Sequence, residues 1–213
     1  MLEKMDAFFE ARLADYDEHM RREIQGAEEF YPFTAAQLPR GHILDLGCGT
    51  GLELEYYVNL NPAARITGID LSAGMLAALK AKFPRQDMTL IRGSYFDVPL
   101  GTACFDGAVS VESLHHFTLE EKIPLYVKLH AALKAGGYFI LTDYFAPDDA
   151  YEAFYFGELR RLKAEQGIED REFYHYDTPL TVAHETEALI QAGFSKVEVL
   201  RNWGATYTLK AWK

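Results

Sequence analysis

Cysteine and basic residues are scarce in this sequence, and no long apolar run occurs. Only Cys48 and Cys104 are present, too few for a disulfide framework, so a reducing cytoplasm is the expected setting. Acidic residues outnumber basic ones by 32 to 21, and the net charge of −11 disfavours nucleic acid as a partner. Neither a signal-peptide core nor a run of membrane-spanning length is found. We therefore expect a cytoplasmic protein with no membrane partner.

What the sequence does contain is a regular alternation of strand and helix patterns from residue 42 onward. Its 213 residues suffice for one well-buried domain. Short apolar runs followed by turn residues predict strands, and longer mixed stretches predict helices. The expected strands are 42–46, 65–70, 88–92, 104–111 and 137–143, and the expected helices are 51–60, 72–82, 118–134 and a stretch near 148–166. This alternation predicts an α/β fold with a parallel sheet, right-handed crossovers and helices on both faces.

Capping signals mark the ends of these helices. Ser72 is expected to cap the second helix, and Thr118 with Glu121 forms a capping box for the third. Pro124 suggests that this third helix starts somewhat later than the capping box. Gly136-Gly137 is expected to end it.

The end of the chain breaks the alternation. Residues 181–192 predict a helix closed by Gly193, and residues 195–202 and 205–213 predict two strands. The joint between these strands is too short for a helical crossover, so they are expected to form an antiparallel hairpin.

Two segments lie outside the alternating part. Residues 3–25 have apolar side chains at nearly helical spacing with charges between them, which predicts an amphipathic helix. It either docks on the domain or caps a ligand site, and in the second case Tyr16 on its apolar face would contact the ligand. Residues 31–33 and 39–41 are expected to connect it to the first strand. The aromatic-rich segment 144–180 is expected to cover a cleft, although a packed surface helix would have a similar composition.

A turn with glycine at three alternate positions, Gly47, Gly49 and Gly51, follows the first strand. Glycine there permits positive φ or close approach of a ligand, and the following helix start offers backbone N–H donors. Dinucleotide sites use G-x-G-x-x-G with an acid about 20 residues further on. Leu52 stands at the sixth position here, whereas Asp70 meets the requirement for an acid. A nucleotide-like cofactor is expected, its ribose bound by Asp70.

These motifs resemble the class I S-adenosylmethionine-dependent methyltransferases. The matching segments are Leu44–Gly51, Ile69–Ser72 with Met75-Leu76, Phe105–Ser110 with Leu114–Phe117, and Leu133–Gly137 before Phe139–Leu141. The resemblance covers about residues 40–143 and 181–213. It implies a Rossmann-like fold with a mostly parallel seven-strand sheet and a C-terminal antiparallel hairpin. Segments 1–39 and 144–180 lie where such enzymes place their variable substrate elements.

The resemblance also implies a site for S-adenosylmethionine, with S-adenosylhomocysteine as product. The residues carried over by position are Gly47, Cys48, Gly49 and Gly51 with Asp45 for the methionine part, Asp70 for the ribose, Leu71, Ser94 and Tyr95 for the adenine, and Ser110 and Val111 beside the sulfonium. Ser94 departs from the family, which frequently has an acid there, and Asp97 is an alternative for that role. The Cys48 side chain is interpreted as a small filler of the turn.

Methyl transfer mainly requires alignment of the acceptor, and it needs a base only where the acceptor must lose a proton. His115 and His116 lie just beyond the fourth strand, at the edge where α/β sheets bind ligands. His115 is the candidate catalytic residue; the alternative is a loop histidine bonded to backbone. Asp143 and Tyr144, after the fifth strand, could contact the acceptor together with Tyr16.

Other acids and histidines do not form a metal-ligand pattern. Solvated side chains are expected instead at Asp143, Asp148, Asp149, His175, Asp177 and His184. No metal is therefore expected.

The leading prediction is a single-domain methyltransferase acting on a small molecule, as a monomer or homodimer. Its parts would be a helical cap over 1–39, a cofactor-binding core over 40–143, a cover over 144–180, and a helix with the hairpin over 181–213. One alternative is a protein that binds S-adenosylmethionine and modifies the cofactor itself or has a regulatory role. A less favoured alternative is an NAD-dependent oxidoreductase. The choice among oxygen, nitrogen and carbon acceptors stays open.

Overall fold

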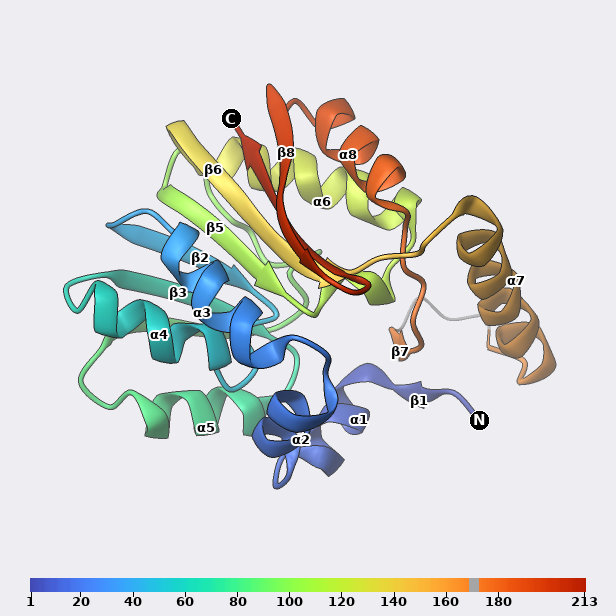
Figure 1. Cartoon of the computed structure of the whole chain (residues 1–213). Helices are drawn as coiled ribbons and strands as arrows, with labels where there is room; N and C mark the ends of the chain where they lie inside the picture. Colours follow the sequence, from blue (N-terminus) through green and yellow to red (C-terminus); the bar gives the residue numbers. More distant parts are fainter. Residues whose placement is uncertain (169–172) are drawn as a thin grey trace.

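The centre of the molecule is one seven-stranded sheet, in a computed structural model that describes residues 1–168 and 173–213 (Figure 1). In spatial order its strands are β4 (Asp87–Arg92), β3 (Arg65–Asp70), β2 (His42–Leu46), β5 (Phe105–Val111), β6 (Leu133–Tyr144), β9 (Thr206–Trp212) and β8 (Lys196–Trp203). Strands β2 to β6 are parallel, and β9 runs antiparallel to both β6 and β8. The predicted Rossmann-like sheet with a C-terminal antiparallel hairpin is confirmed.

Helices cover both faces of the sheet (Figure 1). One face carries α3 (Ala27–Gln37), α4 (Leu52–Leu60) and α5 (Ala73–Lys82), and the other carries α6 (Leu119–Ala132) and α8 (Val182–Gln191). Phe30, Tyr57 and Leu79 belong to the apolar core on the first face. Leu125 and Leu189 belong to the core on the second face. This sandwich of helices and sheet holds the carboxyl ends of the parallel strands along a single edge.

The junction between α6 and β6 differs from the prediction. Helix α6 ends at Ala132, and β6 begins at Leu133, so Gly136 and Gly137 lie inside the strand instead of ending the helix. The pairing of β5 with β6 shifts in register after Phe105. Gly136 has a φ of +77°, a conformation that glycine adopts at little cost. The two glycines therefore serve an irregularity in the strand.

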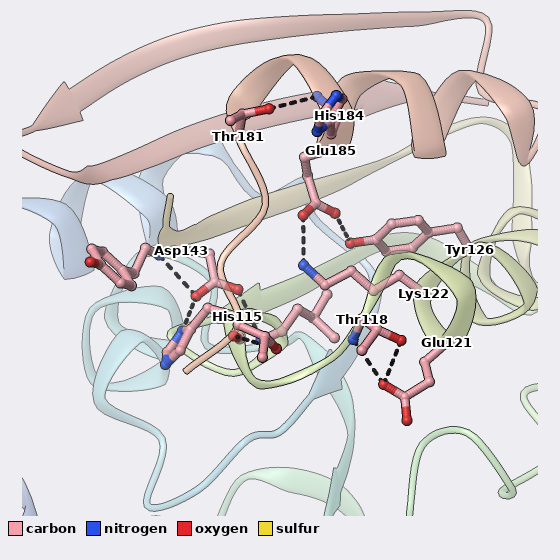
Figure 2. A network of polar contacts seen from close by, with 12 residues as sticks. His115, Thr118, Glu121, Lys122, Tyr126, Asp143, Thr181, His184 and Glu185 are labelled. Carbon is pink, nitrogen blue, oxygen red and sulfur yellow. Dashed lines mark hydrogen bonds and ion pairs between the residues drawn. The ribbon is translucent and has the colours of Figure 1, made fainter. Parts of the chain in front are cut away.

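The predicted helix caps are present. The Ser72 hydroxyl accepts a hydrogen bond from the Met75 backbone N–H at 3.1 Å. The Glu121 carboxylate accepts one from the Thr118 backbone N–H at 2.8 Å, as the capping box requires (Figure 2). Because this box satisfies the first turn, α6 begins at Leu119, and the later start suggested by Pro124 is wrong.

The N-terminal segment is not one helix. It contains β1 (Glu3–Lys4), α1 (Met5–Arg12) and α2 (Tyr16–Glu23), with a turn between the helices. This break lets α1 contact α5 while α2 contacts α3. The expected connection at 31–33 is also wrong, because these residues lie inside α3 with Pro32 in its interior. Burial of the neighbouring Phe30 and Tyr31 stabilises the helix there.

The aromatic-rich segment projects from the sheet. Helix α7 (Asp149–Glu165) has no buried residue and stands apart from the sheet in Figure 1. The short strand β7 (Tyr174–His175) pairs antiparallel with β1, so this segment meets the N-terminal one. Part of the predicted cover over 144–180 lies outside the described residues. Among the helices of the described residues, none is both long and apolar enough to cross a bilayer.

Candidate active site

The glycine turn has a backbone conformation and packing that require glycine. Gly47, Gly49 and Gly51 all have positive φ, between +47° and +74°. A Cβ atom at Gly47 would lie 2.1 Å from the Ser113 hydroxyl oxygen. Only glycine satisfies both the conformation and the close approach at this position.

Asp70 lies at the end of β3 and faces this turn. Its Oδ2 accepts a hydrogen bond from the Gly49 N–H at 2.9 Å, and its Oδ1 accepts one from the Ser72 N–H at 2.8 Å. Burial raises the pKa of Asp70, although the backbone N–H bonds partly oppose the shift. The carboxylate is thus held in place at the carboxyl edge of the sheet, as predicted.

A cavity of about 50 Å³ opens at this edge, and we call it the cofactor cavity. The predicted site residues that line it are Tyr16, Gly47, Gly49, Asp70, Leu71 and Tyr95. Ligand cavities usually measure about 300–1,000 Å³. The cofactor cavity must therefore widen before a nucleotide-sized ligand enters.

Helices α1 and α2 close the cavity through contacts with the glycine turn and with α5. The Ser72 hydroxyl donates a hydrogen bond to Glu10 on α1 at 2.6 Å. On α2, Asp17 accepts one from the Thr50 hydroxyl at 2.5 Å and pairs with Lys82 at 2.8 Å. Movement of these two helices, which would open the cavity, has to break these contacts.

Two buried acids lie beside the glycine turn, one on β2 and one on α4. Asp45 is 1% exposed and Glu53 is 4% exposed. Within the described part of the chain, Asp45 Oδ2 and Glu53 Oε1 have no hydrogen-bond partner. Burial, with repulsion from Glu53, raises the pKa of Asp45, and burial also raises that of Glu53. Two adjacent buried carboxyl groups, each with one oxygen that lacks a hydrogen-bond partner within residues 1–168 and 173–213, suit a cationic ligand such as an ammonium group.

A second cavity of about 630 Å³ adjoins the first, and we call it the histidine cavity. Its wall includes His19, His115, His116 and His175. The residues common to both cavities are Phe9, Tyr16, Glu112 and His116. The two cavities therefore meet along one wall.

His115 is held by a buried carboxylate. Its Nδ1 lies 2.5 Å from Asp143 Oδ1, and Asp143 Oδ2 accepts a hydrogen bond from the Leu114 N–H at 2.8 Å (Figure 2). Burial opposes the charged imidazole, but the attraction of Asp143 prevails and raises the pKa of His115 to about 9. The His115 ring therefore bonds to a side-chain carboxylate, and the alternative of a loop histidine bonded to backbone is wrong. Asp143 is buried, not a solvated loop acid.

Glu112 is a site residue that the sequence reasoning did not select. It follows β5 directly and has a φ of +48°, unusual for a residue other than glycine. Its side chain is 7% exposed, and its Oε1 accepts a hydrogen bond from the Thr206 hydroxyl at 3.1 Å. Burial raises its pKa to about 7. Strained backbone of this kind concentrates at functional sites. In the sequence, the one feature that could have indicated Glu112 is its position directly after a predicted strand.

Several predicted site residues lie near the cavities without lining them. Ser110 donates a hydrogen bond to the Leu46 carbonyl at 2.9 Å, and Ser94 accepts one from the Phe96 N–H at 3.2 Å. Tyr144 lies 2.5 Å from Tyr151, hydroxyl to hydroxyl. The predicted residues outside both linings are Asp45, Cys48, Gly51, Ser94, Ser110, Val111, Asp143 and Tyr144.

The C-terminal histidines divide between two places. His184 pairs with Glu152 at 2.9 Å, away from both cavities. His175 and Asp177 instead line the histidine cavity, where the His175 ring lies 4.8 Å from that of His116. Asp177, whose side chain is 44% exposed, is solvated in part as expected, but both residues also belong to a cavity that the sequence did not predict.

Fold and site together define an α/β protein that binds a nucleotide-like cofactor at the carboxyl edge of its sheet. The family model of the methyltransferase domain matches residues 44–141, which include the glycine turn and Asp70. This match, with the fold and the glycine turn, supports a class I S-adenosylmethionine-dependent methyltransferase family, whose cofactor is S-adenosylmethionine.

Known relatives agree with this family. The chain is 29% identical to a carboxy-S-adenosyl-L-methionine synthase of Wolinella succinogenes, over 95% of this chain and 91% of the relative. It is 28% identical to the O-methyltransferase cnsE of Penicillium expansum, over 74% of this chain and 53% of the relative. The solved DhpI–SAH complex superposes with a TM-score of 0.71 at 18% identity, covering 97% of this chain and 93% of that one. Other matched relatives are covered only in part: the chain spans 25% of the length of one, over 48% of this chain, and 57% of another, over 27% of this chain.

Proposed function

We propose that the protein transfers a methyl group from S-adenosylmethionine to a small molecule bound in the histidine cavity. The observation that carries this proposal is the shared wall of the two cavities, to which Tyr16, Glu112 and His116 contribute. A donor on one side of that wall and an acceptor on the other would meet there. The 630 Å³ of the histidine cavity suits a small organic molecule.

The residues around the cofactor cavity can hold S-adenosylmethionine. Gly47 and Gly49, which line the cavity, would contact its methionine part. Its ammonium group would favour ionisation of the buried carboxyl groups of Asp45 and Glu53, whose pKa values are raised by burial. Asp70 would bind the ribose hydroxyls. The cofactor supplies a methyl group activated by a sulfonium. The remaining task of the protein is then to align the acceptor, which can contribute about 7–11 kcal/mol.

An oxygen acceptor is the favoured class. O-methyltransferase cnsE is among the relatives, and a fatty-acid O-methyltransferase of Mycolicibacterium smegmatis is 29% identical over 62% of this chain and 46% of its own length. Nucleic acid is disfavoured by the net charge of −11.

The test uses the full chain with S-adenosylmethionine carrying a deuterated methyl group and fractions of a small-molecule extract. We expect a labelled product and S-adenosylhomocysteine in equal amounts. Glu112→Gln, on the shared wall, should lower the rate, whereas Glu187→Gln, on the exposed side of α8, should not. Tight cofactor binding without product in any fraction would contradict the proposal, as would label found only on RNA or protein.

Modification of the cofactor itself is the second candidate, favoured by the nearly full-length match to a carboxy-S-adenosyl-L-methionine synthase. A carboxylated sulfonium calls for a nearby cation. Among the described residues, no lysine or arginine lines the cofactor cavity, and Glu112 lies there instead. Mass spectrometry of the ligand that copurifies separates the two candidates, because only the second predicts a carboxylated cofactor.

A further inference from the structure

Three side chains on the wall of the histidine cavity converge from distant parts of the sequence. His115 and His116 come from the 3-10 turn after β5 (Leu114–His116), and Asp177 follows β7. One ligand atom from each lies within 4.8 Å of the other two. We propose that His115, His116 and Asp177 bind one divalent transition-metal ion, in place of the metal-free site that the sequence predicts.

The distances suit a shared ion. Asp177 Oδ1 lies 3.7 Å from His115 Nε2 and 3.1 Å from His116 Nδ1. Bonds from Zn²⁺ to histidine nitrogen or carboxylate oxygen measure about 2.0–2.2 Å. Both separations are shorter than two such bonds placed end to end, so an ion bonded to Asp177 Oδ1 can reach either histidine nitrogen.

His115 has the support that metal-binding histidines usually have. Its Nδ1–H donates to Asp143, and Asp143 is itself fixed by the Leu114 N–H (Figure 2). A carboxylate on one ring nitrogen sets the tautomer and orients the other nitrogen toward the metal. The orientation of His115 Nε2 toward Asp177 follows this arrangement.

His116 supplies an independent observation. Its side chain is 5% exposed, and its Nδ1 has no hydrogen-bond partner among the described residues. The 3.1 Å approach to Asp177 does not have the alignment of a hydrogen bond. Buried polar atoms of this kind usually have a partner, and a metal ion would provide one.

The charge around the three ligands also favours a cation. The carboxylates of Glu112 and Asp143 lie 3.9 Å and 2.5 Å from His115 Nδ1, and Asp177 adds a third. These groups favour a proton on His115 as well, so an ion has to displace the proton of Nε2.

Two histidines and one carboxylate leave coordination positions open. Because all three ligands line the histidine cavity, an open position can take an oxygen of the acceptor. The expected acceptor is then a hydroxyl or carboxylate compound that coordinates the ion. This role in the reaction rests on the proposed function, whereas binding of the ion does not.

The experiment uses the full chain without a histidine tag, stripped by a chelator and then titrated with Co²⁺ and Zn²⁺. We expect one ion per chain by elemental analysis, and a visible Co²⁺ absorption that Zn²⁺ removes. His116→Ala and Asp177→Ala should each weaken Co²⁺ binding at least tenfold. His19→Ala is the matched control, because His19 lines the same cavity outside the cluster.

Binding of S-adenosylhomocysteine by each variant shows that it is folded. Absence of stoichiometric Co²⁺ and Zn²⁺ in a chain that still binds S-adenosylhomocysteine would overturn the proposal, and so would equal loss of binding in His19→Ala. A full rate of methyl transfer by the metal-free chain would overturn the role of the ion in the reaction. A metal-binding chain with no acceptor would instead contradict only the proposed function.

Discussion

Replacement of Asp70 by asparagine tests how the cofactor cavity is built. The carboxylate accepts two backbone hydrogen bonds, from Gly49 at 2.9 Å and from Ser72 at 2.8 Å. Asparagine keeps the shape, but it has one acceptor oxygen and places an N–H₂ group against the second backbone donor. One bond is therefore lost, and the other no longer has a charged acceptor. Hydrogen bonds to charged groups contribute about 1.5–3 kcal/mol, and neutral ones about 0.5–1.5 kcal/mol.

The same change should weaken cofactor binding. A ribose hydroxyl bonded to the carboxylate would lose about 1.5–3 kcal/mol, and each ~1.4 kcal/mol corresponds to a tenfold change in Kd. We expect Asp70→Asn to raise the Kd for S-adenosylhomocysteine about 10- to 100-fold, measured by isothermal titration calorimetry at fixed salt. Asp87→Asn is the control, because that side chain on β4 is 71% exposed. A Kd for Asp70→Asn within about twofold of the wild-type value, with thermal stability unchanged, would refute the assignment of Asp70.

Two further predictions concern buried charges. Because burial raises the pKa of Asp45 in the folded state, the folded chain retains a proton that the unfolded chain releases, so stability should fall as pH rises above the ordinary carboxyl pKa. Asp45→Asn should flatten the pH dependence of the free energy of unfolding, measured by urea unfolding between about pH 4 and pH 9. An unchanged slope would contradict the raised pKa of Asp45. Lys122→Met should cost about 3–5 kcal/mol, because it leaves Glu185 buried without the partner now at 2.7 Å (Figure 2). Adding Glu185→Leu should recover more than half of the lost free energy of unfolding. If the double variant is as unstable as Lys122→Met alone, the unpaired Glu185 carboxylate is not the cause of the instability.

Local patterns in the sequence were sufficient for the central fold. Strands of the parallel sheet, the capping box at Thr118 and the terminal hairpin depend on residues close together in the chain, so periodicity and turn residues predict them. Where packing over long distances competes with local propensity, prediction failed. Pro32 suggested a connecting segment, yet burial of Phe30 and Tyr31 against the sheet keeps it within a helix. Gly136 suggested a helix end, yet it lies in a strand irregularity set by pairing with β5.

The half of the site that would hold the cofactor was predictable for the same reason. Gly47, Gly49 and Asp70 follow two adjacent strands, and parallel strands bring such ends to one edge. The other half was predictable only in part. Tyr16 and the two histidines after β5 were candidates from the sequence, although the break in the N-terminal helix was not. Glu112, with its unusual φ, and Asp177, from the distant β7 segment, were not expected in the site.

The sequence by itself therefore determined the sheet, the glycine turn and the class of cofactor, since each is encoded by neighbouring residues and their spacing. Only the tertiary structure decided that the histidine cavity exists, that it shares a wall with the cofactor cavity, and that His115, His116 and Asp177 meet there. These features depend on how the N-terminal helices and the β7 segment pack over the sheet edge. That packing results from the side chains buried between distant segments, which no local pattern in the chain reports.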